Sequence, residues 1–170
     1  FSGAGVTVSA VNVVDNYSAS LTVSVSGTAT IGAHDLTLTN TDAGTSTATG
    51  ALTIVAGPSV SLVSPSSLGQ SALSKTVTLT GTGFQSGLTV SFSNAGVTGT
   101  VTSLTSTSVT LTVSVSSTAT PGAVEVRLTN PDAGTSTAAL SVTAAPTGSG
   151  FAPSTLGQGA TSTTVVVTGT

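Results

Sequence analysis

The chain contains no cysteine, methionine or tryptophan, and few charged side chains. Without cysteine, disulfide bonds and thiol chemistry are excluded. Charged residues make up 4% of the 170 residues, and the two basic and five acidic side chains leave a net charge of −3. A nucleic-acid partner requires many Lys and Arg side chains to neutralise phosphates, so this composition excludes that class of function.

Long apolar runs are also missing. No run approaches the roughly 18 apolar residues that a membrane-spanning helix needs, so we expect no membrane insertion by this segment. The first residues lack the charged and apolar parts of a signal peptide, so any signal or anchor is expected outside the segment. The sequence is instead rich in Ser and Thr and poor in Lys. This composition favours a secreted bacterial protein, located extracellularly or on the cell surface.

An internal repeat of about 90 residues organises the chain. The segment Leu21–Thr30 returns as Leu111–Thr120 with one change, at an offset of 90 residues. In the same way, Pro65–Ala72 returns as Pro153–Ala160, with two changes and at an offset of 88 residues. A period of this length matches one small β-sandwich.

Short segments rich in Pro, Gly and Ser mark the boundaries of the repeat at 56–59 and 145–150. We therefore divide the chain into a partial repeat at 1–57 that lacks its first strands, a complete repeat at 58–147, and the first strands of a further repeat at 148–170.

Apolar residues alternate with Thr and Ser through each repeat, which predicts strands with one apolar face and one hydroxyl-bearing face. No stretch has the period of a helix. The positions predicted to be buried are Val77, Leu79, Val90, Phe92, Leu111, Val113, Val126, Leu128, Leu140 and Val142. The positions predicted to be exposed are Thr76, Thr78, Thr89, Thr112, Glu125 and Arg127. The fold class is therefore all-β, with tandem β-sandwiches.

Four motifs of the complete repeat resemble the IPT/TIG family of immunoglobulin-like domains. They are Ser64–Gln70, Val77–Phe84, Thr118–Gly122 and Val126–Asp132. The first copy departs from the pattern at Ile31 and Thr41, where the second copy has Pro121 and Pro131. The resemblance implies sandwiches of about seven strands per repeat, used in tandem arrays on bacterial surfaces or beside enzyme domains. It implies no activity.

The chain offers few groups for chemistry. His34 is the only imidazole and aligns with Val124 in the other copy, so we expect a half-covered structural histidine and no base or ligand. With no second histidine and no cysteine, a zinc site is excluded. Asp42 and Asp132 each supply one acid to a turn, whereas calcium needs six or more oxygens, so turn formation is favoured. We expect no metal, no cofactor and no catalytic residue.

Two residues are candidates for covalent modification. Lys75 would be the lysine of an intramolecular isopeptide bond, but its equivalent in the repeat is Thr163, and no acid lies near it in sequence. Asn16 begins the only N-glycosylation sequon, which occurs once and is expected to be a chance match. O-glycosylation of exposed Thr and Ser remains an alternative.

Two functions from different classes fit this sequence. The first is a structural repeat of an extracellular bacterial surface fibre or filament. The second is an adhesin or carbohydrate-binding accessory module, which normally presents exposed aromatic residues. Phe84 and Phe92 are expected in the core, which leaves Tyr17 as the one exposed candidate. We favour the structural function and expect no enzyme activity, with a glycan or surface receptor as the open alternative partner.

The division of the repeat also suggests a mode of assembly. Strands missing from 1–57 correspond to those present in 148–170, so we expect copies of the chain to join head to tail, either through a continuous chain or by noncovalent strand complementation. The residues expected at this polymer interface are Val165, Val166, Val167, Phe1, Leu21 and Val23.

Overall fold

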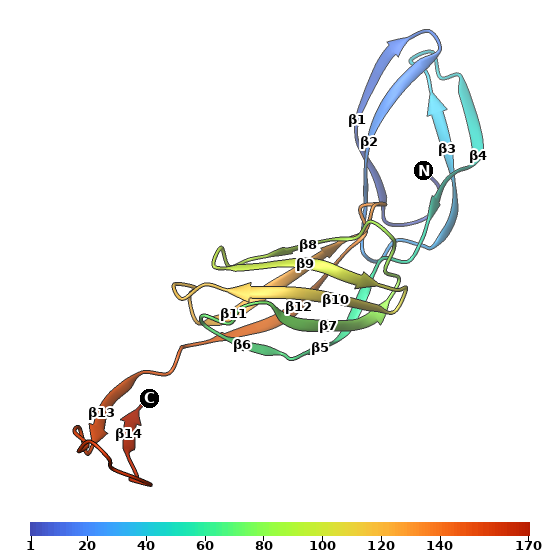
Figure 1. Ribbon diagram of the computed structural model, residues 1–170. Helices are drawn as coiled ribbons and strands as arrows, with labels where there is room; N and C mark the ends of the chain where they lie inside the picture. Colours follow the sequence, from blue (N-terminus) through green and yellow to red (C-terminus); the bar gives the residue numbers. More distant parts are fainter. The chain divides into compact units, whose positions relative to one another are not determined.

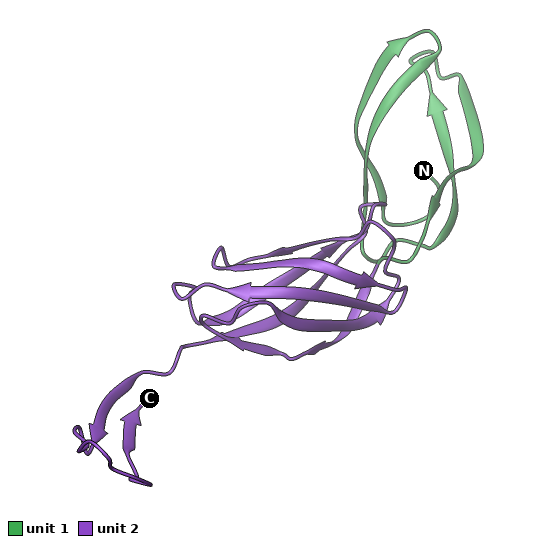
Figure 2. Ribbon diagram, in the orientation of Figure 1, with its two compact units in different colours: residues 1–57 green, residues 58–170 purple.

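A computed structural model describes all residues, 1–170, and shows fourteen β-strands and no helix. The predicted all-β class is confirmed. The chain forms two compact units, Phe1–Gly57 and Pro58–Thr170, shown in Figure 2. No helix in the structure has the length and apolar character needed to cross a membrane.

Eight strands between residues 58 and 147 form a β-sandwich, which we call the central sandwich (Figure 1). One sheet has the strand order β5-β7-β10-β9 and the other has the order β6-β12-β11-β8. The strand bounds are β5 Ser59–Ser64, β6 Ser67–Gly69, β7 Lys75–Thr82, β8 Thr89–Phe92, β9 Val97–Leu104, β10 Ser108–Val115, β11 Gly122–Thr129 and β12 Thr135–Thr143.

The first strand of the sandwich is divided between the two sheets. β5 pairs with β7 in one sheet, and β6 pairs in parallel with β12 in the other. Pro65 lies between them and has no N–H group to donate to a ladder, which interrupts the pairing at this point. The division gives eight strand segments, where the family resemblance implied about seven strands.

The core of the central sandwich follows the predicted alternation. Buried side chains include eight of the ten predicted: Val77, Leu79, Leu111, Val113, Val126, Leu128, Leu140 and Val142. Val90 and Phe92 are only half-buried, because their strand β8 lies at the edge of its sheet. The side chain of Phe92 packs over Gly99, where an added Cβ would lie 2.9 Å from Cζ of the ring.

The predicted outer face is confirmed at four positions and wrong at two. Thr76, Thr89, Glu125 and Arg127 are exposed, whereas Thr78 and Thr112 are half-buried. Thr78 lies on β7 and Thr112 on β10, and both strands have a neighbour on each side, so adjacent side chains cover these hydroxyls.

An amide side chain holds one end of the central sandwich. At the end that contains Ser59, the buried Asn130 donates from Nδ2 to the carbonyl of Gly83 at 2.8 Å, and its Oδ1 accepts from the N–H of Gln85 at 3.2 Å. The chain leaves the sandwich after β12, at the opposite end (Figure 1).

Residues 1–57 form what we call the N-terminal unit, which has two separate two-stranded sheets. β1 (Val6–Asp15) pairs with β2 (Ser18–Val25), and β3 (Gly32–Thr39) pairs with β4 (Thr45–Ile54). Only His34 and Ile54 are buried in this unit. By the sequence repeat, β1 to β4 correspond to β9 to β12 of the central sandwich, where each sheet has four strands.

Residues 148–170 form a hairpin, which we call the C-terminal hairpin. Its strands β13 (Gly148–Ala152) and β14 (Val166–Gly169) pair only with each other. Almost all of its residues are exposed, including Phe151, at 63% of its surface, and Val167, at 59%.

Candidate functional site

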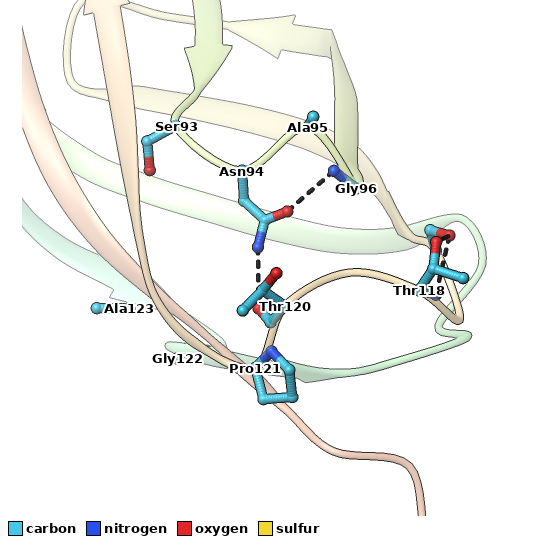
Figure 3. A pocket seen from close by; sticks show the side chains of 10 residues that line it. Ser93, Asn94, Ala95, Gly96, Thr118, Thr120, Pro121, Gly122 and Ala123 are labelled. Atoms are coloured by element: carbon cyan, nitrogen blue, oxygen red, sulfur yellow. Dashed lines mark hydrogen bonds between the residues drawn. The ribbon is translucent and has the colours of Figure 1, made fainter.

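A hollow on the central sandwich lies between the loops Ser93–Gly96 and Ser116–Ala123 and has a volume of about 690 Å³ (Figure 3). The side chain of Asn94 links the two loops, because its Nδ2 donates to the carbonyl of Thr120 at 2.9 Å. Its Oδ1 accepts from the N–H of Gly96, also at 2.9 Å. These bonds fix the shape of the hollow.

The lining of this hollow contains no acid, base or aromatic side chain. Its hydroxyls bond to one another, as in the 2.9 Å contact between Ser116 Oγ and Thr118 Oγ1. Acid–base or nucleophilic catalysis needs a titratable group within hydrogen-bond reach of the substrate, and this hollow supplies none. A second hollow of about 280 Å³, beside β5, is lined by 60–63, Ser66, Ala138 and Ala139 and is equally free of such groups.

His34 lies on β3 and is buried, with 2% of its surface exposed. The expectation of a half-covered histidine is therefore wrong. Its Nε2 lies 2.7 Å from the carbonyl of Thr30, and its Nδ1 contacts the carbonyl of Ser2. Two carbonyl acceptors favour the doubly protonated imidazolium, so first Ser2 and then Thr30 raise the pKa of His34 above its ordinary value.

The repeat explains why a histidine occupies this position. In the central sandwich, the side chain of Asn94 bonds to the carbonyl of Thr120, and Val124 occupies the position of His34. In the N-terminal unit, Gly3 replaces the asparagine, and His34 contacts the equivalent carbonyl instead. An added Cβ on Gly3 would lie 2.5 Å from Cε1 of the imidazole, so the glycine makes room for the ring. Both neighbouring acceptors are backbone carbonyls, which indicates a structural role for His34.

The two turns that contain Asp42 and Asp132 have the same hydrogen bond. Asp42 Oδ1 accepts from the N–H of Gly44 at 3.0 Å, and Asp132 Oδ1 accepts from the N–H of Gly134 at 2.9 Å. No group of three or more His, Cys, Asp and Glu side chains is placed to hold a metal ion. Lys75 is exposed at the start of β7.

Tyr17 lies at the turn between β1 and β2 with 98% of its surface exposed. Its N–H and the hydroxyl of Ser18 both donate to Asp15 Oδ1 at 2.8 Å, and these bonds lower the pKa of Asp15. The neighbouring Asn16 is exposed too. Phe84 is buried, as expected.

The residues predicted at a polymer interface lie on partly unpaired strands. Leu21 and Val23 are half-buried on β2, whose only sheet neighbour is β1, and Phe1 is half-buried before β1. Val165, Val166 and Val167 are exposed by 39%, 54% and 59% in or beside β14, whose only neighbour is β13.

The sequence analysis did not identify one group of structural residues, the amide side chains that bond to backbone groups at the ends of the central sandwich. At the end of the central sandwich where the chain leaves it, Gln70 Nε2 donates to the carbonyl of Ala119 at 2.7 Å, and its Oε1 accepts from the N–H of Ala145 at 2.9 Å. The signal that could have found such residues is their recurrence in the repeat, where Gln70 corresponds to Gln158, and Asn130 corresponds to Asn40.

Comparison with known proteins gave one family. The model of the IPT/TIG domain matches residues 58–144, more than half of the chain and nearly all of the central sandwich. A search of curated proteins found no match.

Proposed function

Because this chain belongs to the IPT/TIG family, whose immunoglobulin-like domains serve as structural or binding modules, we propose that it is a structural segment of an extracellular bacterial surface fibre or filament, with copies joined head to tail. The observation that carries the proposal is the repeat of about 90 residues, in which the strand sequences of the N-terminal unit recur in the central sandwich. Domains repeated in tandem build extended structures in which each repeat contacts its neighbours.

The surface chemistry supports a structural role without catalysis. Exposed strand positions carry mainly Thr and Ser, and both hollows of the central sandwich lack titratable side chains. Spacers of four residues separate β4 from β5 and β12 from β13. Short spacers limit bending between successive domains, which suits a stalk or fibre. IPT/TIG domains occur in extracellular and cell-surface proteins, in agreement with this location.

Tyr17 favours a second candidate, an adhesin or carbohydrate-binding module. An aromatic side chain that is 98% exposed at a hairpin turn offers one face for stacking against a sugar ring. The central sandwich has Thr107 at the equivalent position, so the platform is not repeated.

Electron microscopy and light scattering of the purified chain over a range of concentrations test the structural proposal. We expect particles whose length grows with concentration, and no binding on a glycan array. A Tyr17→Ser variant serves as the matched control and should form the same particles. A chain that remains monomeric at every concentration and binds a glycan through Tyr17 would contradict the structural proposal and favour the binding module.

A further inference from the structure

We infer that Gln70 holds the linker 144–147 against the central sandwich and so sets the direction in which the chain leaves this domain. The inference adds to the proposed function, because a fibre needs junctions that resist bending. The contact itself lies within one chain and does not require assembly.

The strand arrangement places Gln70 beside the start of the linker. The short strand β6 pairs in parallel with β12, and the last pair in their register is Gly69 with Thr143. Parallel strands end at the same edge of a sheet, so the residues that follow this pair leave the sheet side by side. The N–H of Gln70 donates to the carbonyl of Thr143 at 2.9 Å and extends the pairing by one residue.

The amide side chain of Gln70 joins the linker to the body of the sandwich. Its Oε1 accepts from the N–H of Ala145 at 2.9 Å, and its Nε2 donates to the carbonyl of Ala119 at 2.7 Å. Ala119 is buried in the loop that connects β10 to β11. Because the amide uses both its acceptor and its donor, the reversed orientation would set oxygen against oxygen and nitrogen against nitrogen. The linker is therefore tied to a buried point of the fold through one orientation of this side chain.

The backbone around Gln70 is held as well. The N–H of Ala72 donates to the carbonyl of Gly69 at 3.1 Å, and the N–H of Val115 donates to the carbonyl of Ala72 at 2.7 Å. Ser71 has a φ of 64°, a left-handed conformation that a residue with a side chain keeps only where surrounding contacts favour it. The glutamine side chain thus starts from a backbone whose position is fixed by the sandwich.

The linker has little freedom beside this contact. Ala145 is half-buried, whereas Ala144, Pro146 and Thr147 are exposed. The ring of Pro146 fixes its own φ and restricts the preceding Ala145 to extended conformations. The hydrogen bond and the proline together constrain two of the four linker residues, which limits bending where the chain leaves the sandwich.

The sequence repeat carries the residues of this contact. The chain has three glutamines, and two of them, Gln70 and Gln158, end the recurring motif Pro-Ser-x-Leu-Gly-Gln. Pro146 is equivalent to Pro58, which lies at the preceding domain boundary. Recurrence of both residue types beside domain boundaries indicates that these positions favour an amide and a proline.

Native-state hydrogen exchange of the full chain in dilute solution tests the contact. The amide of Ala145 should be protected in the unmodified chain, and Gln70→Ala should make it exchange about tenfold faster, because its acceptor is lost. The matched control is Gln85→Ala, which removes an amide side chain that donates to Asp132 at the opposite end of the sandwich. This control should leave the exchange of Ala145 unchanged.

A Gln70→Met variant separates the hydrogen bonds from the packing, because methionine fills a similar space without an amide. It keeps the test valid if alanine destabilises the sandwich. In both Gln70 variants the NMR order parameter of the Ala145 N–H should fall from near 0.85 to below about 0.6, while the amides of β12 stay rigid. An Ala145 amide that exchanges at its intrinsic rate in the unmodified chain, or that stays protected and ordered in Gln70→Met, would overturn the inference.

The same samples separate this inference from the proposed function. Particles in the microscope, together with an unprotected Ala145 amide in the unmodified chain, would overturn the role of Gln70 and leave the proposed function standing. A protected Ala145 amide that loses its protection in Gln70→Met, in a chain that forms no particles, would support the role of Gln70 and contradict the proposed function.

Discussion

The same five residues, Leu-Thr-Val-Ser-Val, occur in β2 from Leu21 and in β10 from Leu111, but their burial differs. Val115 is 1% exposed in the central sandwich, whereas the equivalent Val25 is 49% exposed in the N-terminal unit. The alternation of side chains is the same in both strands. The comparison shows that a strand sequence sets which face is apolar, and that neighbouring strands decide whether that face is covered.

The physical reason lies in the number of contacts available to each strand. β10 has a strand on either side and a second sheet of four strands to pack against, so its apolar face is removed from water. β2 has one neighbour, and the other sheet of its unit has only two strands. Two-stranded sheets are marginal in isolation, because they bury too little apolar surface to offset the loss of chain entropy.

The largest expected effect comes from substituting the equivalent leucines Leu111 and Leu21. Leu111→Ala should lower the free energy of unfolding of the central sandwich by about 2–5 kcal/mol, because it leaves a cavity in a packed core. Leu21→Ala should cost less than half as much in the isolated chain, since Leu21 is only half-buried. Urea titration followed by residue-resolved NMR separates the two units. Equal costs for Leu21→Ala and Leu111→Ala would contradict the difference in burial between the two leucines.

A second difference between the two units concerns the equivalent residues Asn130 and Asn40. Asn130 is buried, and its two hydrogen bonds reach Gly83 and Gln85, so Asn130→Ala should cost about 1–3 kcal/mol by leaving these backbone groups without their partner. Asn40 is exposed, and Asn40→Ala should change stability by less than about 0.5 kcal/mol. Thermal unfolding of both variants provides the measurement. A large effect at Asn40 would show that its side chain also holds a loop.

The sequence predicted the strand faces and the repeat, because both follow from the alternation of Val and Leu with Thr. It placed Leu79, Leu111 and Leu128 in the core, and all three are buried. It overestimated the burial of Val90 and Phe92, because alternation does not show whether a strand lies at the edge of a sheet. It underestimated the burial of His34, because the two carbonyls around the ring come from residues 4 and 32 positions away.

The imidazole of His34 makes the stability of the N-terminal unit depend on pH in a way that the central sandwich does not share. Its pKa in the folded unit is raised, first by the carbonyl of Ser2 and then by that of Thr30, with a further contribution from Asp35, while burial of the ring opposes the shift. The protonated ring therefore stabilises the N-terminal unit below its ordinary pKa of about 6.5, and this contribution is lost as the pH rises through the raised value.

NMR titration of the ring protons should place the midpoint of His34 above that of a free histidine. Hydrogen exchange near Ser2 should become faster as the pH rises, after correction for the intrinsic rate. The central sandwich has Val124 at this position and should show no such change. A midpoint at or below the ordinary value would contradict the two carbonyl contacts. A Gly3→Asn/His34→Val double variant, which introduces the pair found in the central sandwich, should remove the pH dependence.

The smallest expected effect concerns the turn between β1 and β2 and the equivalent turn between β9 and β10. In the N-terminal unit, Asp15 accepts from Tyr17 and Ser18, whereas in the central sandwich the hydroxyl of Thr105 accepts from the N–H groups of Thr107 and Ser108. The bonds from Tyr17 and then Ser18 lower the pKa of Asp15, so they stabilise the turn above its ordinary pKa, and this contribution is lost as the pH falls through the lowered value.

Amide chemical shifts recorded from neutral to acidic pH should therefore move at Tyr17 and stay constant at Thr107. The Asp15→Asn variant should abolish the movement at Tyr17 with little change in the urea midpoint, because the asparagine oxygen still accepts a hydrogen bond and the turn is fully exposed. The reciprocal Thr105→Asp variant should transfer the pH dependence to the central sandwich. A change in the amide shift of Thr107 in the unmodified chain would contradict this prediction, because Thr105 has no group that titrates.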